Sequence, residues 1–165
     1  MLTKQSVILE IFKRGVLAGA AGGLAEMVWV SAYAALTGGD AAVLARGVTT
    51  ASGLTALLPA TSVAAGIGIH MLLAVALGLA LAGLWQGLSS RTPANGLYAG
   101  TLAVLAAVWA NNFFVLLPAI SPEFVHLVPY SVSLMSKLLF GLAAAEVFRR
   151  YAIVSAQARS SQAIA

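Results

Sequence analysis

Four stretches of the sequence are long and apolar enough to cross a lipid bilayer, and this feature constrains the fold more than any other. A membrane-spanning helix needs about 20 predominantly apolar residues. The predicted spans cover residues 14–36, 61–86, 93–118 and 129–148. Charged residues make up only 8% of the chain, against about 25% in a typical soluble domain. We therefore expect an all-α integral membrane protein, with residues 1–165 forming one compact bundle of four transmembrane helices.

The connection between the first two spans, Asp40–Ala60, is long and apolar for a loop. We expect it to contain a short helix that lies in the membrane interface, with Asp40 as its N-cap. A re-entrant segment is the alternative, although its backbone would need protein or water around it. Further along, Thr92-Pro93 predicts the start of the third span, and Pro129 predicts a bend or a break at the start of the fourth.

The distribution of basic residues predicts the orientation of the bundle. Lys and Arg are enriched in the cytoplasmic segments of membrane proteins. The other side of the predicted bundle carries Arg46 with Asp40 and Glu123. We therefore expect a multi-pass protein of a bacterial-type inner membrane with both termini in the cytoplasm. The basic residues on that side are Lys4, Lys13, Arg14, Arg91, Arg149, Arg150 and Arg159.

Each predicted span carries at least one strongly polar residue. Glu26 lies in the first span, His70 in the second and Lys137 in the fourth, and the third contains the amide pair Asn111-Asn112. A helix rises about 1.5 Å per residue, which places all of these groups in one slab of the membrane. We predict that Glu26 and Lys137 form an ion pair, with His70 and an asparagine as hydrogen-bonding neighbours.

Small residues share helix faces with these polar groups. Such residues mark the faces where membrane helices approach closely, within one chain or between two copies. The polar cluster is therefore expected between helices, where it either fixes helix register or forms a proton relay, ion path or ligand site. The sequence leaves both interpretations open. The glycines predicted to pack are Gly15, Gly19, Gly22, Gly66, Gly100 and Gly141.

Cofactor and metal chemistry find little support in the sequence. The chain has no cysteine, which excludes disulfides and thiolate ligands. His126 and His70 lie at different predicted depths, unlike the facing pair that a b-type haem requires. We expect no cofactor, and a Cu(I) site built from soft ligands is only a weak candidate. Its ligands would be His70, Met27, Met71 and Met135.

Two functions from different classes fit these features. The first is a non-catalytic accessory subunit of a larger membrane complex, of respiratory or photosynthetic type, because the sequence contains no recognisable catalytic motif. The second is a small ion- or proton-coupled transporter or channel that uses the intramembrane polar cluster. We expect the accessory role, with the bilayer and other membrane subunits or a second copy as partners. Basic residues sit at the ends of spans, so no nucleic-acid partner is expected.

Overall fold

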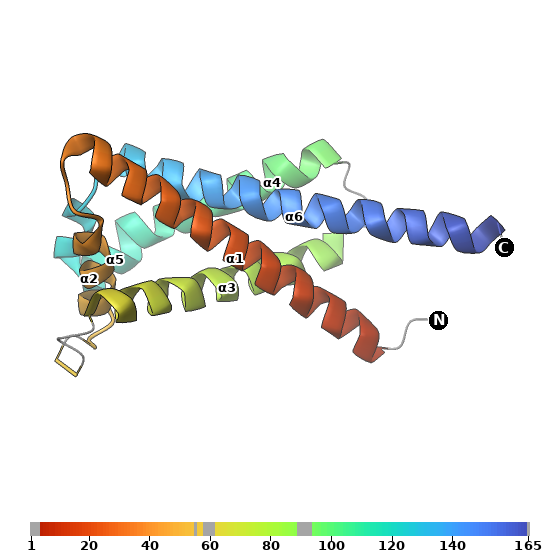
Figure 1. Ribbon diagram of the computed structural model, residues 1–165, viewed down its shortest axis with the longest axis horizontal. Coiled ribbons are helices and arrows are strands. Elements are labelled where there is room, and N and C mark those ends of the chain that lie inside the picture. The colour runs from red at the N-terminus through yellow and green to blue at the C-terminus, as the bar shows by residue number, and fades with distance from the viewer. Residues whose placement is uncertain (1–3, 55, 58–61, 89–93, 165) are drawn as a thin grey trace.

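A computed structural model describes residues 4–54, 56–57, 62–88 and 94–164 of the protein, and every regular element in these ranges is helical. Four helices are long and apolar enough to cross a membrane, which confirms the predicted all-α membrane fold. The first helix of the described chain begins, and the last one ends, at the same end of the bundle (Figure 1). The elements are α1 (Lys4–Thr37), α2 (Ala41–Ala51), α3 (Ser62–Leu88), α4 (Ala94–Asn111), η1 (Asn112–Leu116), α5 (Leu117–Ile120), η2 (Pro122–His126) and α6 (Tyr130–Ile164).

Several boundaries differ from the prediction. α1 starts before Arg14, and α6 continues past Phe148, because the polar residues beyond the apolar stretches also favour helix. Pro129 lies between the 3₁₀ helix η2 and α6, so it interrupts the helical structure rather than bending a continuous helix. The predicted cap at Thr92-Pro93 lies outside the described residues.

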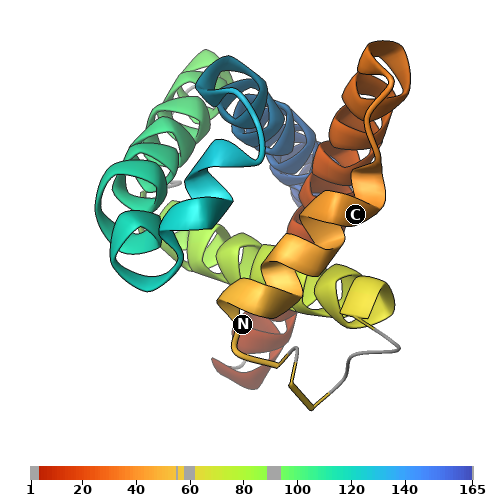
Figure 2. The same cartoon turned by 90° about the vertical axis from the view of Figure 1, so that its left-hand side faces the viewer.

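The short α2 forms where the sequence predicted a helix in the first connection. Asp40 adopts an extended backbone and accepts a hydrogen bond from the amide of Ala42 at 2.8 Å, as an N-cap does. Gly38 and Gly53 flank the helix with positive φ angles, which glycine adopts without steric cost. α2 packs on α3 and crosses the end of the bundle opposite the chain termini (Figure 2).

α1 packs along both α3 and α6, and α6 packs in turn along α4. α1 and α3 approach so closely that their backbones touch. A Cβ atom placed on Gly78 would lie 2.3 Å from the carbonyl oxygen of Gly15 and 2.4 Å from the amide of Gly19. Close approach through small residues is how membrane helices gain packing contacts.

The apolar core lies on one side of the polar residues. It is centred on Phe140, which is fully buried, and lies between Glu26 and the chain termini along each helix. On the other side of Glu26, toward α2, the helices line a partly open cavity. The core cluster consists of Ala18, Ala74, Leu81, Ala82, Trp85, Leu105, Phe140, Ala144 and Phe148.

Candidate functional site

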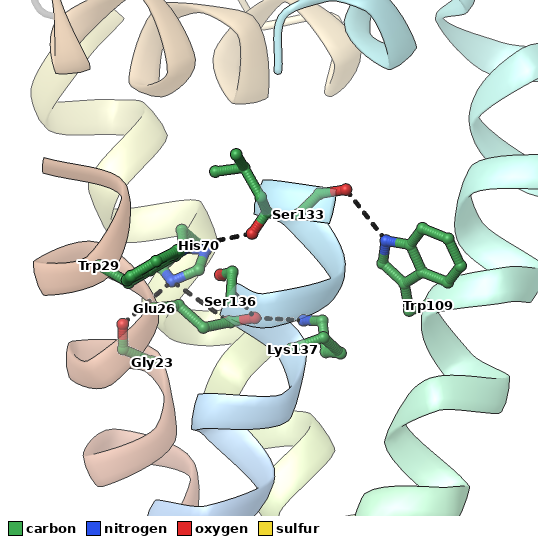
Figure 3. Close-up of polar contacts among 9 residues, drawn as sticks. Gly23, Glu26, Trp29, His70, Trp109, Ser133, Ser136 and Lys137 are labelled. Atoms are coloured by element: carbon green, nitrogen blue, oxygen red, sulfur yellow. Dashed lines mark hydrogen bonds and ion pairs between the residues drawn. The ribbon is translucent and has the colours of Figure 1, made fainter. Parts of the chain in front are cut away.

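Glu26 and Lys137 form an ion pair between α1 and α6, as Figure 3 shows. The ammonium nitrogen of Lys137 lies 2.7 Å from Oε1 of Glu26. Glu26 is 5% exposed, so the carboxylate is almost entirely surrounded by protein. A buried charge of this kind is tolerated only with a close partner of opposite sign. The aromatic ring of Phe140, 5.4 Å from the ammonium, adds a cation–π contact.

His70 and Ser136 complete the surroundings of the carboxylate. Nε2 of His70 lies 3.7 Å from Oε2 of Glu26 and 3.3 Å from the carbonyl oxygen of Gly23. The hydroxyl of Ser136 donates to Oε1 of Glu26 at 3.5 Å. The imidazole can donate to the Gly23 carbonyl in the tautomer that carries the proton on Nε2. Glu26 thus meets donors from α3 and from α6 (Figure 3).

These charged residues line a cavity of about 340 Å³. Most of its wall is apolar, and its polar side chains are those of Glu26, Ser31, His70, Ser133, Ser136 and Lys137. An apolar pocket with a few convergent polar groups is the usual form of a small-molecule site. The apolar wall includes Met27 and Val30 from α1, Leu44 and Val48 from α2, Val63 and Ile67 from α3, and Phe113, Phe124 and Val128.

α2 closes the cavity from the end of the bundle. A Cβ atom on Gly66 would lie 1.8 Å from the carbonyl oxygen of Ala45, so α2 rests directly on the backbone of α3. The hydroxyl of Thr49, which is fully buried, donates to the carbonyl of Ser62. At the other end of α2, a guanidinium nitrogen of Arg46 lies 2.9 Å from Oδ2 of Asp40. These contacts place the apolar side of α2 over Glu26, His70 and Lys137.

Two tryptophans fix the start of α6, the helix that carries Lys137. The indole N–H of Trp29 donates to the carbonyl of Val132 at 3.0 Å. From the other side, the indole N–H of Trp109 donates to the hydroxyl of Ser133 at 3.0 Å. Sequence analysis did not identify these contacts, because a tryptophan in an apolar stretch gives no indication of its hydrogen-bond acceptor.

The structure does not bring Asn111 or Asn112 to the ion pair, contrary to the expected hydrogen-bonding role. Asn111 is exposed, Asn112 is half-buried, and neither lines the cavity. α4 packs along α6 through Trp109. Asn111 follows Trp109 by two residues, about 200° around the helix, and therefore lies on the opposite face. Similar depth in the membrane does not bring the asparagines to the ion pair, because the rotation of each helix also decides which side chains meet.

The glycines predicted to pack face different partners. Gly15 and Gly19 contact α3, whereas Gly22 lies against the ring of Phe140 on α6. Gly66 faces α2 rather than another long helix. Gly100 lies under the indole of Trp85, and Gly141 packs against Leu102 and Leu105. One face of α1 therefore serves two neighbouring helices.

The weak copper candidates do not gather into one set. Met27 and His70 both line the cavity, but Met71 packs beside Gly23 and Met135 is exposed. Helical positions turn by about 100° per residue, so Met71 points about 100° from its neighbour His70, and Met135 points about 200° from Lys137, two positions on. Among the described residues, no group of three or more His, Asp or Glu side chains forms a metal site.

A second polar cluster, missed by sequence analysis, lies near the terminal end of the bundle. The hydroxyl of Tyr98 donates to Oε2 of Glu146 at 2.5 Å, and Arg149 and Arg150 each donate to Glu146 at 2.7 Å. The i, i+3 and i, i+4 spacing of these charges on α6 was a readable signal. This cluster ties α4 to α6 on the far side of the apolar core.

Comparison with known proteins gives no relative from which a function can be transferred: no family model, curated protein or solved structure matches the chain.

Proposed function

We propose that this protein is a small membrane carrier that binds a solute in the cavity beneath α2 and moves it with the help of Glu26, His70 and Lys137. The observation that carries the proposal is the position of the ion pair. It forms part of a cavity wall rather than the centre of a packed core. A purely structural ion pair has no need of an adjoining space of about 340 Å³.

The helix geometry next to the cavity supports movement. η1 is a π-helical turn between Asn112 and Leu116, and it contributes Phe113 to the cavity wall. Turns of this kind interrupt the regular hydrogen-bond pattern and are frequent at functional sites.

Accessibility from both sides of the membrane tests the carrier proposal without knowledge of the solute. The chain has no cysteine, so Ser31→Cys places a single thiol of nearly the same size in the cavity wall. A carrier that alternates between two states exposes this thiol to a polar maleimide from either side. We expect labelling in both right-side-out and inverted vesicles. Labelling from one side alone would contradict the proposal.

Leu72→Cys provides the matched control for this experiment. Leu72 is 70% exposed on α3 and does not line the cavity. A thiol there faces lipid and should resist the polar reagent from both sides. Labelling of this control would show that the reagent reaches thiols through the bilayer.

The accessory-subunit role remains a second proposal, and the exposed amide of Asn111 favours it. Asn111 lies inside the apolar span Gly96–Ile120, where an unpartnered amide is costly. A polar residue on a helix of another membrane subunit would satisfy it. Under this proposal, Asn111→Leu should release subunits that co-purify with the wild type in mild detergent. Ala119→Leu, at another exposed position of the same span, should retain them.

A further inference from the structure

We infer that the cavity beneath α2 takes a small amphipathic acid, with a carboxylate head and an apolar body, and that one proton enters with it. This inference rests on the proposed carrier function and assigns its substrate class. It follows from which charges of the site face the cavity, from the net charge of the site and from the size and composition of the wall.

The hydrogen-bond donors of the site are more accessible than the Glu26 carboxylate. Side-chain exposure is 28% for His70 and 19% for Lys137, but only 6% for Glu26. A ligand in the cavity therefore meets hydrogen-bond donors first, and the carboxylate of Glu26 lies behind them. This order favours a ligand whose polar group accepts hydrogen bonds.

Lys137 has donor capacity left for such a ligand. An ammonium group carries three N–H bonds, and Glu26 accepts one of them at 2.7 Å. Its position in the cavity wall allows a ligand oxygen to share the ammonium. A carboxylate is the group that gains most from this contact, because ionised pairs form stronger hydrogen bonds than neutral ones.

The charge of the site requires a proton to accompany the acid. Among the described residues that line the cavity, the titratable groups are Glu26 from α1, His70 from α3 and Lys137 from α6. α2, η1 and η2 contribute no charged group to the wall: Arg46 on α2 is exposed and paired with Asp40, and Glu123 and His126 on η2 are exposed and do not line the cavity. Glu26 and Lys137 already neutralise each other. An added carboxylate would be an uncompensated charge in an apolar cavity, unless a proton from solution binds to His70 or Glu26.

Volume and wall composition describe the rest of the ligand. The cavity of about 340 Å³ lies at the small end of the range of about 300–1,000 Å³ found for small-molecule pockets, so a short-chain acid such as octanoate is a suitable ligand. The remaining wall is formed mostly by aliphatic and aromatic side chains from α1, α2, α3, η1 and η2, and it suits a hydrocarbon body. Such an acid could reach the site from water or from the bilayer.

Calorimetric titration of the detergent-solubilised protein with three matched probes tests the inference. The probes are octanoate, octylammonium and octanol, which share one chain and differ in head group. We expect octanoate to bind at least tenfold more tightly than the other two. Titrations in two buffers of different ionisation enthalpy should show uptake of about one proton per octanoate bound. Empty micelles provide the background.

Variants connect the binding to the proposed site. Val48→Phe places a larger side chain in the cavity wall and should weaken octanoate binding at least tenfold, with helicity by circular dichroism as the check on folding. The double variant Glu26→Gln with Lys137→Met removes the Lys137 ammonium donor without leaving an unpaired charge. It should also weaken octanoate binding at least tenfold. Leu72→Ala, on the exposed side of α3, should bind octanoate as the wild type does.

The outcomes separate the substrate class from the carrier function. If octylammonium or octanol binds more tightly than octanoate and Val48→Phe abolishes that binding, an acid is ruled out as the substrate class. The carrier proposal then still stands. Octanoate binding without proton uptake would overturn the proton coupling. No binding of any probe above the micelle background would contradict both proposals. If octanoate binds as expected, competition by oleate at lower concentration would identify the bilayer as the source of the acid, and its absence the aqueous phase.

Discussion

Lys137 on the last helix and Glu26 on the first are joined at 2.7 Å, and this contact marks the boundary between the packed core and the cavity. The two residues were expected to pair because each is a charged group inside an apolar stretch. Because they pair, the effect of each charge on the unfolding free energy should depend on whether the other charge is present.

Removal of one partner should be far more harmful than removal of both. Glu26→Gln leaves the Lys137 ammonium without its counter-ion in a largely buried position, at an expected cost of about 3–5 kcal/mol. Combination with Lys137→Met should recover much of that loss. Reversible unfolding in mixed micelles measures the four free energies of the double-mutant cycle. Purely additive losses would show that the pair contributes no coupling energy.

A methyl group between α1 and α3 should force the helices apart. Gly78→Ala places a Cβ atom 2.3 Å from the carbonyl oxygen of Gly15, so we expect a loss of about 1–3 kcal/mol in unfolding free energy. Gly83→Ala on the same helix meets nothing within 4 Å and should be neutral or stabilising by up to about 1 kcal/mol. Equal effects of the two substitutions in micelle unfolding would contradict the close approach.

Low pH should loosen α2. The amide of Ala42 and the guanidinium of Arg46 bond to the Asp40 carboxylate and lower its pKa below the ordinary value. A lowered folded-state pKa means that the cap contributes fully above the unfolded-state pKa of about 3.9. That contribution is lost as pH falls through the lowered value. Hydrogen exchange of the α2 amides should therefore lose protection in acid.

Asp40→Asn separates capping from titration in this experiment. Asparagine is a comparable N-cap but carries no titratable carboxyl. Protection of α2 in this variant should be nearly independent of pH over the same range. Acid loosening identical to that of the wild type would assign the effect to another group.

The orientation of the bundle is a prediction that single cysteines can check. Ser52 is exposed at the α2 end, and Ser161 lies near the end of α6. If the positive-inside rule holds for this chain, a polar maleimide should label Ser52→Cys in intact cells. It should label Ser161→Cys only after permeabilisation. The reverse pattern would place both termini outside.

The sequence predicted the structure best where the burial of a residue type allows only one arrangement. Apolar length specified the four long helices, and the cost of charge in lipid predicted that Glu26 would meet Lys137. Asp40 as the N-cap of α2 followed from its place before an apolar run. These predictions depend on local chemistry and on depth in the membrane, both of which can be read from the chain.

Other features depend on how helices rotate and on which pairs come into contact. Asn111 has the right depth but faces away from α6, because Trp109 occupies the contact face. The cavity arises because α2 lies across the bundle, held by Thr49 and by the close approach of Gly66 to Ala45. No property of those residues taken singly predicts a cavity beneath them.

The placement of the ion pair also has a consequence for biosynthesis. Glu26 leaves the ribosome on the first membrane helix and Lys137 on the last, so the carboxyl group enters the membrane well before its counter-ion is made. Before α6 is made, the nascent chain holds α1, α3 and α4, and the Glu26 carboxyl group has no Lys137 to pair with. We therefore expect the contact between α1 and α6 at this ion pair to form only after Lys137 has been synthesised.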